Sequence, residues 1–193
     1  METVQLAIVK RPFKEPHCGD QAGYWEHNEK FVLCVIDGLG HGMRAEQAAL
    51  AALDLLERHH RNPLLEVFAA CDKALRDTRG VAMGIAVTDP ATGTLTYAGI
   101  GNTRAMVVGQ KTKWLSSYYG IVGGGYRTLK AVTVPLTPGD LVIMYTDGIK
   151  EFIDLSDYSE ISRAEVGRLA KRILEDRRCE TDDAAVLVFL NEE

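Results

Sequence analysis

The sequence predicts an α+β fold in which antiparallel strands are accompanied by three helices. Two observations support this class. Strand-like segments follow one another through short turns that suit hairpins, and helical periodicity is confined to two parts of the chain. With 193 residues, of which 46% are hydrophobic, the chain can bury a sizeable core, and we expect residues 1–193 to form a single domain.

Three strands are predicted in the N-terminal part. The alternating segment Val4–Lys10 is the first, and Gly23–Glu26 and the apolar run Phe31–Ile36 are the next two, joined by a polar turn. The apolar run leads directly into Asp37, and a loop with two prolines carries Asp20. A hairpin of the second and third strands would bring these two acids to the same end.

Two helices are predicted next. Small and apolar residues occupy nearly every face of Met43–Arg61, which indicates a helix packed closely on a sheet. The pair Asn62-Pro63 ends it, and apolar residues at helical spacing predict a second helix over Leu64–Thr78. We expect the two helices to be antiparallel neighbours on one face of a sheet.

The middle of the chain predicts an antiparallel meander. Strand patterns cover Val81–Thr88, Thr94–Gly99 and Thr103–Val108, with a Pro- and Gly-containing turn between the first two. The segment Ser116–Tyr126 is too rich in glycine for a regular strand and too aromatic for a simple linker. We interpret it as a mobile flap near the site.

The C-terminal part predicts three more strands and one helix. Two strands, Leu129–Val134 and Leu141–Thr146, lie on either side of a Pro-Gly-Asp turn. The sequence Ser162–Glu165 matches a capping box and opens an amphipathic helix that closes at Arg177-Arg178. A strongly apolar strand, Ala184–Leu190, follows.

The end of the third strand predicts a binding site. Asp37 stands there, followed by Gly38, Gly40 and Gly42, and glycines allow sharp turns and a close approach of the backbone to a ligand. A dinucleotide-binding G-x-G-x-x-G loop would require glycine where Met43 stands, and the carboxylate would repel a pyrophosphate. The stretch therefore favours a cation site over a nucleotide loop, with an ordinary turn as the alternative.

Carboxylates recur at the ends of the predicted core strands. Any one of them could be a surface acid in a turn, but together they suit hard divalent cations such as Mg²⁺ and Mn²⁺. Two ions about 4 Å apart could share one carboxylate, activate a bridging water and neutralise phosphate oxygens, which favours phosphoester hydrolysis. The acids are Asp20, Asp37, Asp147 and the pair Asp182-Asp183.

Five segments occur in an order and spacing that span nearly the whole chain: CGD (18–20), VIDGLGHG (35–42), GIGNTR (99–104), YTDGI (145–149) and TDDAAVLVF (181–189). In these segments the chain resembles the metal-dependent protein phosphatases of type 2C, and among them the short bacterial sporulation and stress branch. The resemblance implies a four-layer αββα sandwich of two antiparallel β-sheets flanked by helices. It also implies two Mn²⁺ or Mg²⁺ ions as cofactors.

The resemblance assigns a role to each acid. Asp37 would bridge both metal ions and act in catalysis, and Gly38 would offer its carbonyl oxygen to one of them. Asp147 and Asp182 would complete the first metal site, whereas Asp20 would bind a metal or orient metal-bound water.

The chain departs from the family in its proton donor. Many members carry His directly after the Asp-Gly pair, where this chain has Leu39. His41 could donate the proton through a water, or it could be a solvated loop histidine. Asp183 would support its neighbour, and Asn102 stands where larger relatives have an acid linked to a third metal.

The phosphate-binding position differs as well. Larger relatives carry Arg about five residues before the first acid, where this chain has Glu15. Lys14 or His17 could substitute as the substrate-binding residue. None of these departures affects the two-metal core.

The composition excludes other function classes. Lys and Arg number 22 against 27 Asp and Glu, and this net charge of −5 argues against nonspecific nucleic-acid binding. Neither a signal-like start nor a run of about 18 apolar residues is present, so no membrane contact is expected. The four cysteines lack disulfide or zinc spacing, which indicates reduced thiols and a cytoplasmic location. A monomer is expected, because neither a coiled coil nor an interface stripe is evident.

The resemblance implies a serine/threonine protein phosphatase. Its substrates would be phosphorylated stressosome scaffold proteins of the anti-sigma antagonist type. Two alternatives remain at this point: a catalytically silent regulatory domain that keeps the fold and binds a partner, and a hydrolase of small phosphoesters.

Overall fold

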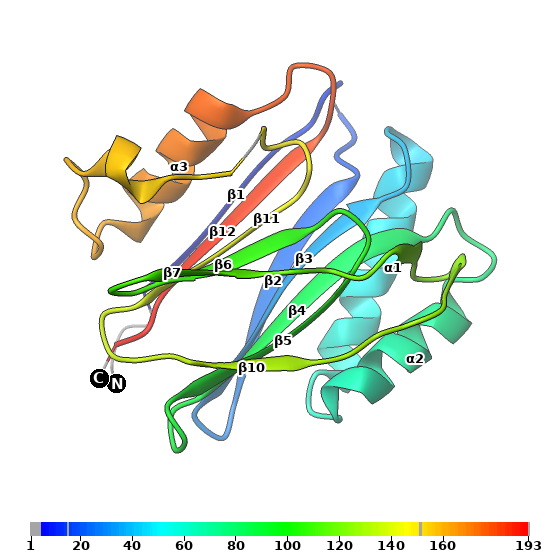
Figure 1. Ribbon diagram of the computed structural model, residues 1–193. Helices are drawn as coiled ribbons and strands as arrows, with labels where there is room; N and C mark the ends of the chain where they lie inside the picture. The colour runs from blue at the N-terminus through cyan, green and yellow to red at the C-terminus, as the bar shows by residue number, and fades with distance from the viewer. Residues whose placement is uncertain (1–4, 15, 151, 193) are drawn as a thin grey trace.

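The computed structural model describes residues 5–14, 16–150 and 152–192, and within these ranges two five-stranded antiparallel sheets lie face to face (Figure 1). The strands of the first sheet are, in spatial order, β10 (Val132–Pro135), β5 (Thr94–Ile100), β4 (Val81–Asp89), β3 (Lys30–Gly38) and β2 (Asp20–His27). Those of the second are β1 (Leu6–Arg11), β12 (Ala184–Leu190), β11 (Leu141–Tyr145), β6 (Arg104–Val108) and β7 (Thr112–Leu115). A separate small hairpin joins β8 (Gly120–Ile121) to β9 (Gly125–Tyr126).

Helices cover the outer faces of both sheets. Figure 1 shows α1 (Met43–His59) and α2 (Leu64–Ala74) outside the first sheet, and α3 (Val166–Arg177) outside the second. A short 3₁₀ helix, Leu155–Tyr158, precedes α3. In α1 the buried residues are mostly alanines, which let the helix lie close to the strands beneath it.

The central strands are buried on both faces, which explains their unbroken apolar sequence. Side chains alternate along a strand, so in β3 Cys34 and Ile36 pack under α1 and α2, whereas Val35 faces the second sheet. In β11, Ile143 packs towards α3 and Met144 towards the first sheet. The order helix, sheet, sheet, helix confirms the expected αββα sandwich.

The predicted meander is wrong at its third strand. β4 and β5 pair as expected, but β6 leaves the first sheet and pairs with β11 and β7 in the second. Gly101, at φ +91°, lies where the chain crosses over. The two strands on either side of the Pro-Gly-Asp turn also lie in different sheets, since β10 pairs with β5 and β11 pairs with β12 and β6.

Smaller differences concern boundaries and short elements. β3 extends through Asp37 and Gly38, because both are paired with β4. The second helix ends at Ala74, before the predicted Thr78, and β7 and the 3₁₀ helix were not expected. In the capping box, Glu165 accepts a hydrogen bond from the Ser162 backbone N–H at 3.0 Å, and α3 begins one residue later.

Two expectations remain outside what the structure tests. Val4, the predicted start of the first strand, lies outside the described residues, and so does Glu15.

None of the helices in the described ranges has both the length and the apolar sequence that a membrane-spanning helix needs.

Candidate metal centre

The hairpin of β2 and β3 places two acids side by side. Asp20 and Asp37 are directly opposed in the ladder, as the sequence predicts for one end of a hairpin. The Gly38 N–H donates a hydrogen bond of 3.0 Å to the Gly19 carbonyl oxygen, which closes this end. The first sheet thus contributes two neighbouring carboxylates.

The second sheet contributes two more. β11 and β12 are antiparallel, with Tyr145 opposite Val186, so the segment after β11 lies beside the segment before β12. The first of these carries Asp147 and the second carries Asp182. Both sheets therefore present acids at the same edge of the sandwich.

These acids lie close enough together to affect the pKa values of Asp20, Asp37 and Asp182. Burial raises the pKa of Asp37 to about 7, with further upward contributions from Asp147 and Asp182. Burial, and then the neighbouring Asp37, raise the pKa of Asp20 well above its ordinary value. The pKa of Asp182 is raised by burial and by Asp147. These shifts place residues from both sheets in one electrostatic cluster.

Polar neighbours hold two of these carboxylates. The Thr146 hydroxyl donates to Asp20 Oδ2 at 2.5 Å, and this bond joins the second sheet to the first. The Asn102 side-chain amide donates to Asp147 Oδ2 at 2.6 Å. Asn102 also lowers the pKa of Asp37 through a hydrogen bond. Asn102 therefore contacts an acid from each sheet.

The donor set suits a hard divalent cation. Carboxylate oxygens are the ligands that Mg²⁺ and Mn²⁺ prefer, and a cation would relieve the repulsion that raises these pKa values. Among the described His, Cys, Asp and Glu side chains, no three already stand in a ready-made metal site. The assignment of Asp20, Asp37, Asp147, Asp182 and the Gly38 carbonyl as ligands therefore remains a prediction.

Both Asp-Gly pairs need their glycine for packing. A Cβ on Gly38 would overlap the backbone carbonyl oxygen of Ala45 in α1, and a Cβ on Gly148 would overlap that of Asp183. With glycine at these positions, the backbone beside Asp37 packs against the backbone of Ala45, and the backbone beside Asp147 packs against that of Asp183. The Gly40 and Gly42 backbones have φ of +84° and +77°, in the region that favours glycine.

Asp183 has a different environment from its neighbour Asp182. It is buried, and its two oxygens accept hydrogen bonds from the N–H groups of Phe13 (2.7 Å) and Gly19 (2.8 Å). These bonds fix the loop before β2 against the start of β12. Asp183 thus holds in place the backbone that leads into Asp20.

Comparisons with known proteins agree with this fold. A family model described as stage II sporulation protein E (SpoIIE) matches residues 27–189. The chain belongs to the SpoIIE family. This membership confirms the resemblance to the bacterial sporulation and stress branch. A structure of the PP2C phosphatase domain and a fragment of the regulatory domain of SpoIIE from Bacillus subtilis shares the fold, with a TM-score of 0.80 at 20% identity over 98% of this chain and 64% of that chain.

The SpoIIE family member described here is also similar to proteins of stress signalling. Phosphoserine phosphatase RsbX of Bacillus subtilis (strain 168) is 26% identical over 137 residues, which cover 68% of this chain and 67% of RsbX. A structure from a study of the bacterial stressosome, a modular system adapted to control secondary messenger signaling, has a TM-score of 0.90 at 27% identity, covering 97% of this chain and 99% of that one. A crystal structure of RsbX in complex with magnesium shares the fold, with a TM-score of 0.84 at 21% identity over 97% and 95% of the two chains.

In this SpoIIE family member, His41 and Lys14 both contact Phe13. Phe13 was not identified from the sequence as part of the site. The exposed His41 ring meets the Phe13 ring edge to face, with 5.7 Å between centroids, and its charge lowers the pKa of Asp182. Lys14 Nζ lies 4.8 Å from the centroid of the same Phe13 ring. Both side chains therefore contact Phe13, and their roles towards substrate remain predictions.

His17 is engaged elsewhere. Its Nδ1 lies 2.6 Å from Glu46 Oε2, and the other Glu46 oxygen accepts from the Cys18 N–H at 3.2 Å. This contact ties the loop to the first turn of α1. His17 is therefore held by Glu46 in the structure, and the assignment of phosphate binding to Lys14 or His17 remains a prediction.

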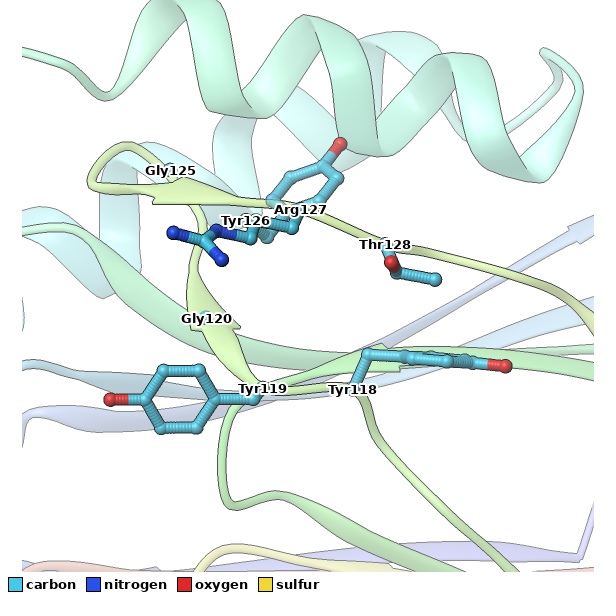
Figure 2. A pocket seen from close by; sticks show the side chains of 7 residues that line it. All are labelled: Tyr118, Tyr119, Gly120, Gly125, Tyr126, Arg127 and Thr128. Atoms are coloured by element: carbon cyan, nitrogen blue, oxygen red, sulfur yellow. The ribbon is translucent and has the colours of Figure 1, made fainter.

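The predicted flap is a small hairpin that is hydrogen-bonded at both ends. Tyr118 exchanges backbone bonds with Gly99 and Gly101, and Val122 exchanges two with Val81. Figure 2 shows the pocket of about 800 Å³ beside it, with Tyr118 and Tyr119 on one side and Tyr126 and Arg127 on the other. The mobility predicted for this segment stays a prediction.

Proposed function

We propose that this SpoIIE family member is a metal-dependent serine/threonine protein phosphatase that acts on proteins of stress signalling. The observation that carries the proposal is the cluster of four carboxylates from two sheets, in which burial and neighbouring acids raise the pKa values of Asp20, Asp37 and Asp182. A cluster of this kind is costly without a cation and suits a two-ion site for phosphoester hydrolysis.

Asp37 is the central residue of the proposed site. It would be shared by two Mn²⁺ or Mg²⁺ ions, and Gly38 would offer its carbonyl oxygen to one of them. Asp147 and Asp182 would complete the first metal site, and Asp20 would bind a metal or orient metal-bound water. The bound ions would supply an activated water and neutralise the phosphate oxygens. The magnesium in the related RsbX structure supports an ion of this kind.

The remaining residues would position the substrate and these ligands. Asn102 holds Asp147, and Thr146 holds Asp20, so both would orient carboxylates. We assign binding of the phosphate to Lys14 and proton donation to the leaving serine oxygen, through a water, to His41. The exposed positions of Lys14 and His41, both beside Phe13, support these assignments.

The substrates that we propose are phosphorylated scaffold proteins of a stressosome, of the anti-sigma antagonist type. The name of RsbX as a phosphoserine phosphatase and the likeness to a stressosome structure support this class. We also propose a monomer in the cytoplasm. The free thiols of Cys18, Cys34, Cys71 and Cys179 support the cytoplasmic location.

Phosphate release from a phosphoserine protein tests the function. With Mn²⁺ we expect release by the wild-type chain, no release in chelator, and a loss of at least about a hundredfold in Asp37→Asn, because that change removes the shared ligand. Asp176→Asn, an exposed change in α3, is the control and should retain full activity. Release that persists in Asp37→Asn would disprove the two-ion site, and absence of release despite bound metal would favour a silent partner-binding domain.

A further inference from the structure

A groove of about 270 Å³ lies beside the candidate metal centre and has no role in the function proposed above. It runs over the ends of β6 and β7, which are neighbours in the second sheet. The residues that matter for its chemistry are Asn102, Arg104, Trp114, Ser116 and Phe152.

One end of the groove is continuous with the acids. Asn102 lines the groove, and the same side chain donates to Asp147 Oδ2 at 2.6 Å and bonds to Asp37. A chain lying in the groove would therefore reach the candidate metal centre at Asn102. This continuity relates the groove to a substrate that reacts at the acids.

Two exposed aromatic side chains form the other end. Trp114 on β7 is 40% exposed and Phe152 is 69% exposed, and their rings meet edge to face with centroids 4.7 Å apart. Large aromatic side chains are enriched where proteins bind other proteins, because they bury much apolar area with little loss of conformational freedom. This pair offers a contact for one large apolar side chain.

The lining between Asn102 and the Trp114–Phe152 pair suits an extended peptide. β7 pairs with β6 on one side, and no described strand pairs with its other edge, so its main-chain groups can receive an added strand. Arg104, with one N–H bonded to the Ile149 carbonyl at 3.3 Å, is the charged residue of the lining. One positive charge next to an acidic centre favours a segment that carries phosphate or other negative charge.

We propose that this groove docks the extended segment next to the phosphorylated serine of a protein substrate, with a large apolar residue of that segment held by Trp114 and Phe152. The proposal rests on the proposed phosphatase function. It assigns specificity to a surface outside the acids, so that hydrolysis of a small phosphoester does not depend on it.

Fluorescence gives a test that does not require turnover. The chain has two tryptophans, Trp25 and Trp114, so Trp25→Phe leaves Trp114 as the only one. The probes are ten-residue peptides with the non-hydrolysable phosphonate analogue of phosphoserine and one phenylalanine placed one to four residues from it, with Mg²⁺ present. We expect at least one peptide to shift Trp114 emission to the blue and to protect it from acrylamide. The converse variant, Trp114→Phe, should show no change.

Kinetics test the same groove during hydrolysis. For Trp114→Ala and Phe152→Ala we expect KM for the matching phosphoserine peptide to rise at least tenfold, while hydrolysis of para-nitrophenyl phosphate changes less than twofold. Tyr24→Ala is the matched control, because Tyr24 is 46% exposed on β2, the edge strand of the other sheet. It should leave both substrates unaffected.

The results distinguish a failure of the proposed docking groove from a failure of the proposed phosphatase function. Protection of Trp114 by peptide without hydrolysis of any substrate would support the groove and disprove the phosphatase. Hydrolysis with unchanged Trp114 emission and unchanged KM in both variants would support the phosphatase and overturn the groove. A blue shift that grows with protein concentration alone would also overturn it, since a second copy of the chain would then be the occupant.

Discussion

At the scale of single residues, Asp37 combines a partly buried position with two nearby negative charges. Its pKa of about 7 in the folded chain lies well above the value of about 4 for an aspartate in an unfolded chain. Between these values the folded state binds more protons than the unfolded state. The free energy of unfolding therefore falls as pH rises through that window.

We expect the chain in chelator to lose stability progressively from about pH 4 to about pH 7 and to change little from this cause at higher pH. Asp20, with a pKa raised in the same direction, adds to the slope. Urea unfolding at a series of pH values measures it, and Asp37→Asn should show a flatter profile. A wild-type stability that increases through this window would contradict the assignment.

Asp183 allows a prediction about the loop that it fixes. In Asp183→Ala the buried N–H groups of Phe13 and Gly19 lose their acceptor, and we expect a loss of about 3 kcal/mol in the free energy of unfolding. Asp176→Ala breaks only an exposed pair with Arg172 and should cost less than about 0.5 kcal/mol. Equal effects of the two changes in denaturant unfolding would refute the supporting role.

The acids of the site were predictable from sequence, whereas their partners were not. Each acid follows or precedes an apolar strand, so strand ends and the resemblance to the phosphatase family identify it. Thr146 bonds to Asp20 across 126 positions, and Glu46 meets His17 across 29, and no local pattern signals either contact. Thr146 could have been suspected only because it directly precedes Asp147.

At the scale of elements, the two Asp-Gly pairs depend on close packing of backbone against backbone. Gly38→Ala and Gly148→Ala would each place a methyl group into a main-chain carbonyl, and we expect losses of about 3 kcal/mol or more. Gly167→Ala is the matched control in α3, where an added Cβ meets nothing within 4 Å. It should stabilise the chain by roughly 0.5–1 kcal/mol. Thermal and urea unfolding of the three variants measures these changes in stability. A Gly38→Ala variant as stable as the wild type would contradict the close packing of Gly38 against Ala45.

Strand identity was easier to predict than strand placement. The long apolar runs of β3, β11 and β12 are visible in the sequence because both faces of each strand are buried. The sheet to which a strand belongs is not, since β6 shows the same alternation whether it pairs with β5 or with β11. β7 has only four residues, three of them exposed, so it carries almost no pattern.

At the scale of the whole molecule, bound metal should stabilise the fold. The proposed ligands come together only when the chain is folded, so an ion binds the folded state preferentially. At a hundred times its dissociation constant, one ion adds about 2.7 kcal/mol, which corresponds to a rise in Tm of roughly 5–10 °C for a chain of this size. Thermal unfolding with Mn²⁺ and with chelator measures the rise. Asp37→Asn should abolish most of it, and an equal rise in that variant would place the metal elsewhere.

The bond from Thr146 to Asp20 joins the two sheets at the point where their acids meet. Asp20 and Asp37 belong to the first sheet, and Asp147 and Asp182 flank strands of the second. A folding intermediate with only one sheet formed would hold half of the acids and would bind a cation weakly. Affinity for the ion therefore arises only at the step in which the sheets dock, and uptake of Mn²⁺ during refolding would time that step. The cation would then connect the two sheets, which are otherwise held together mainly by apolar contact.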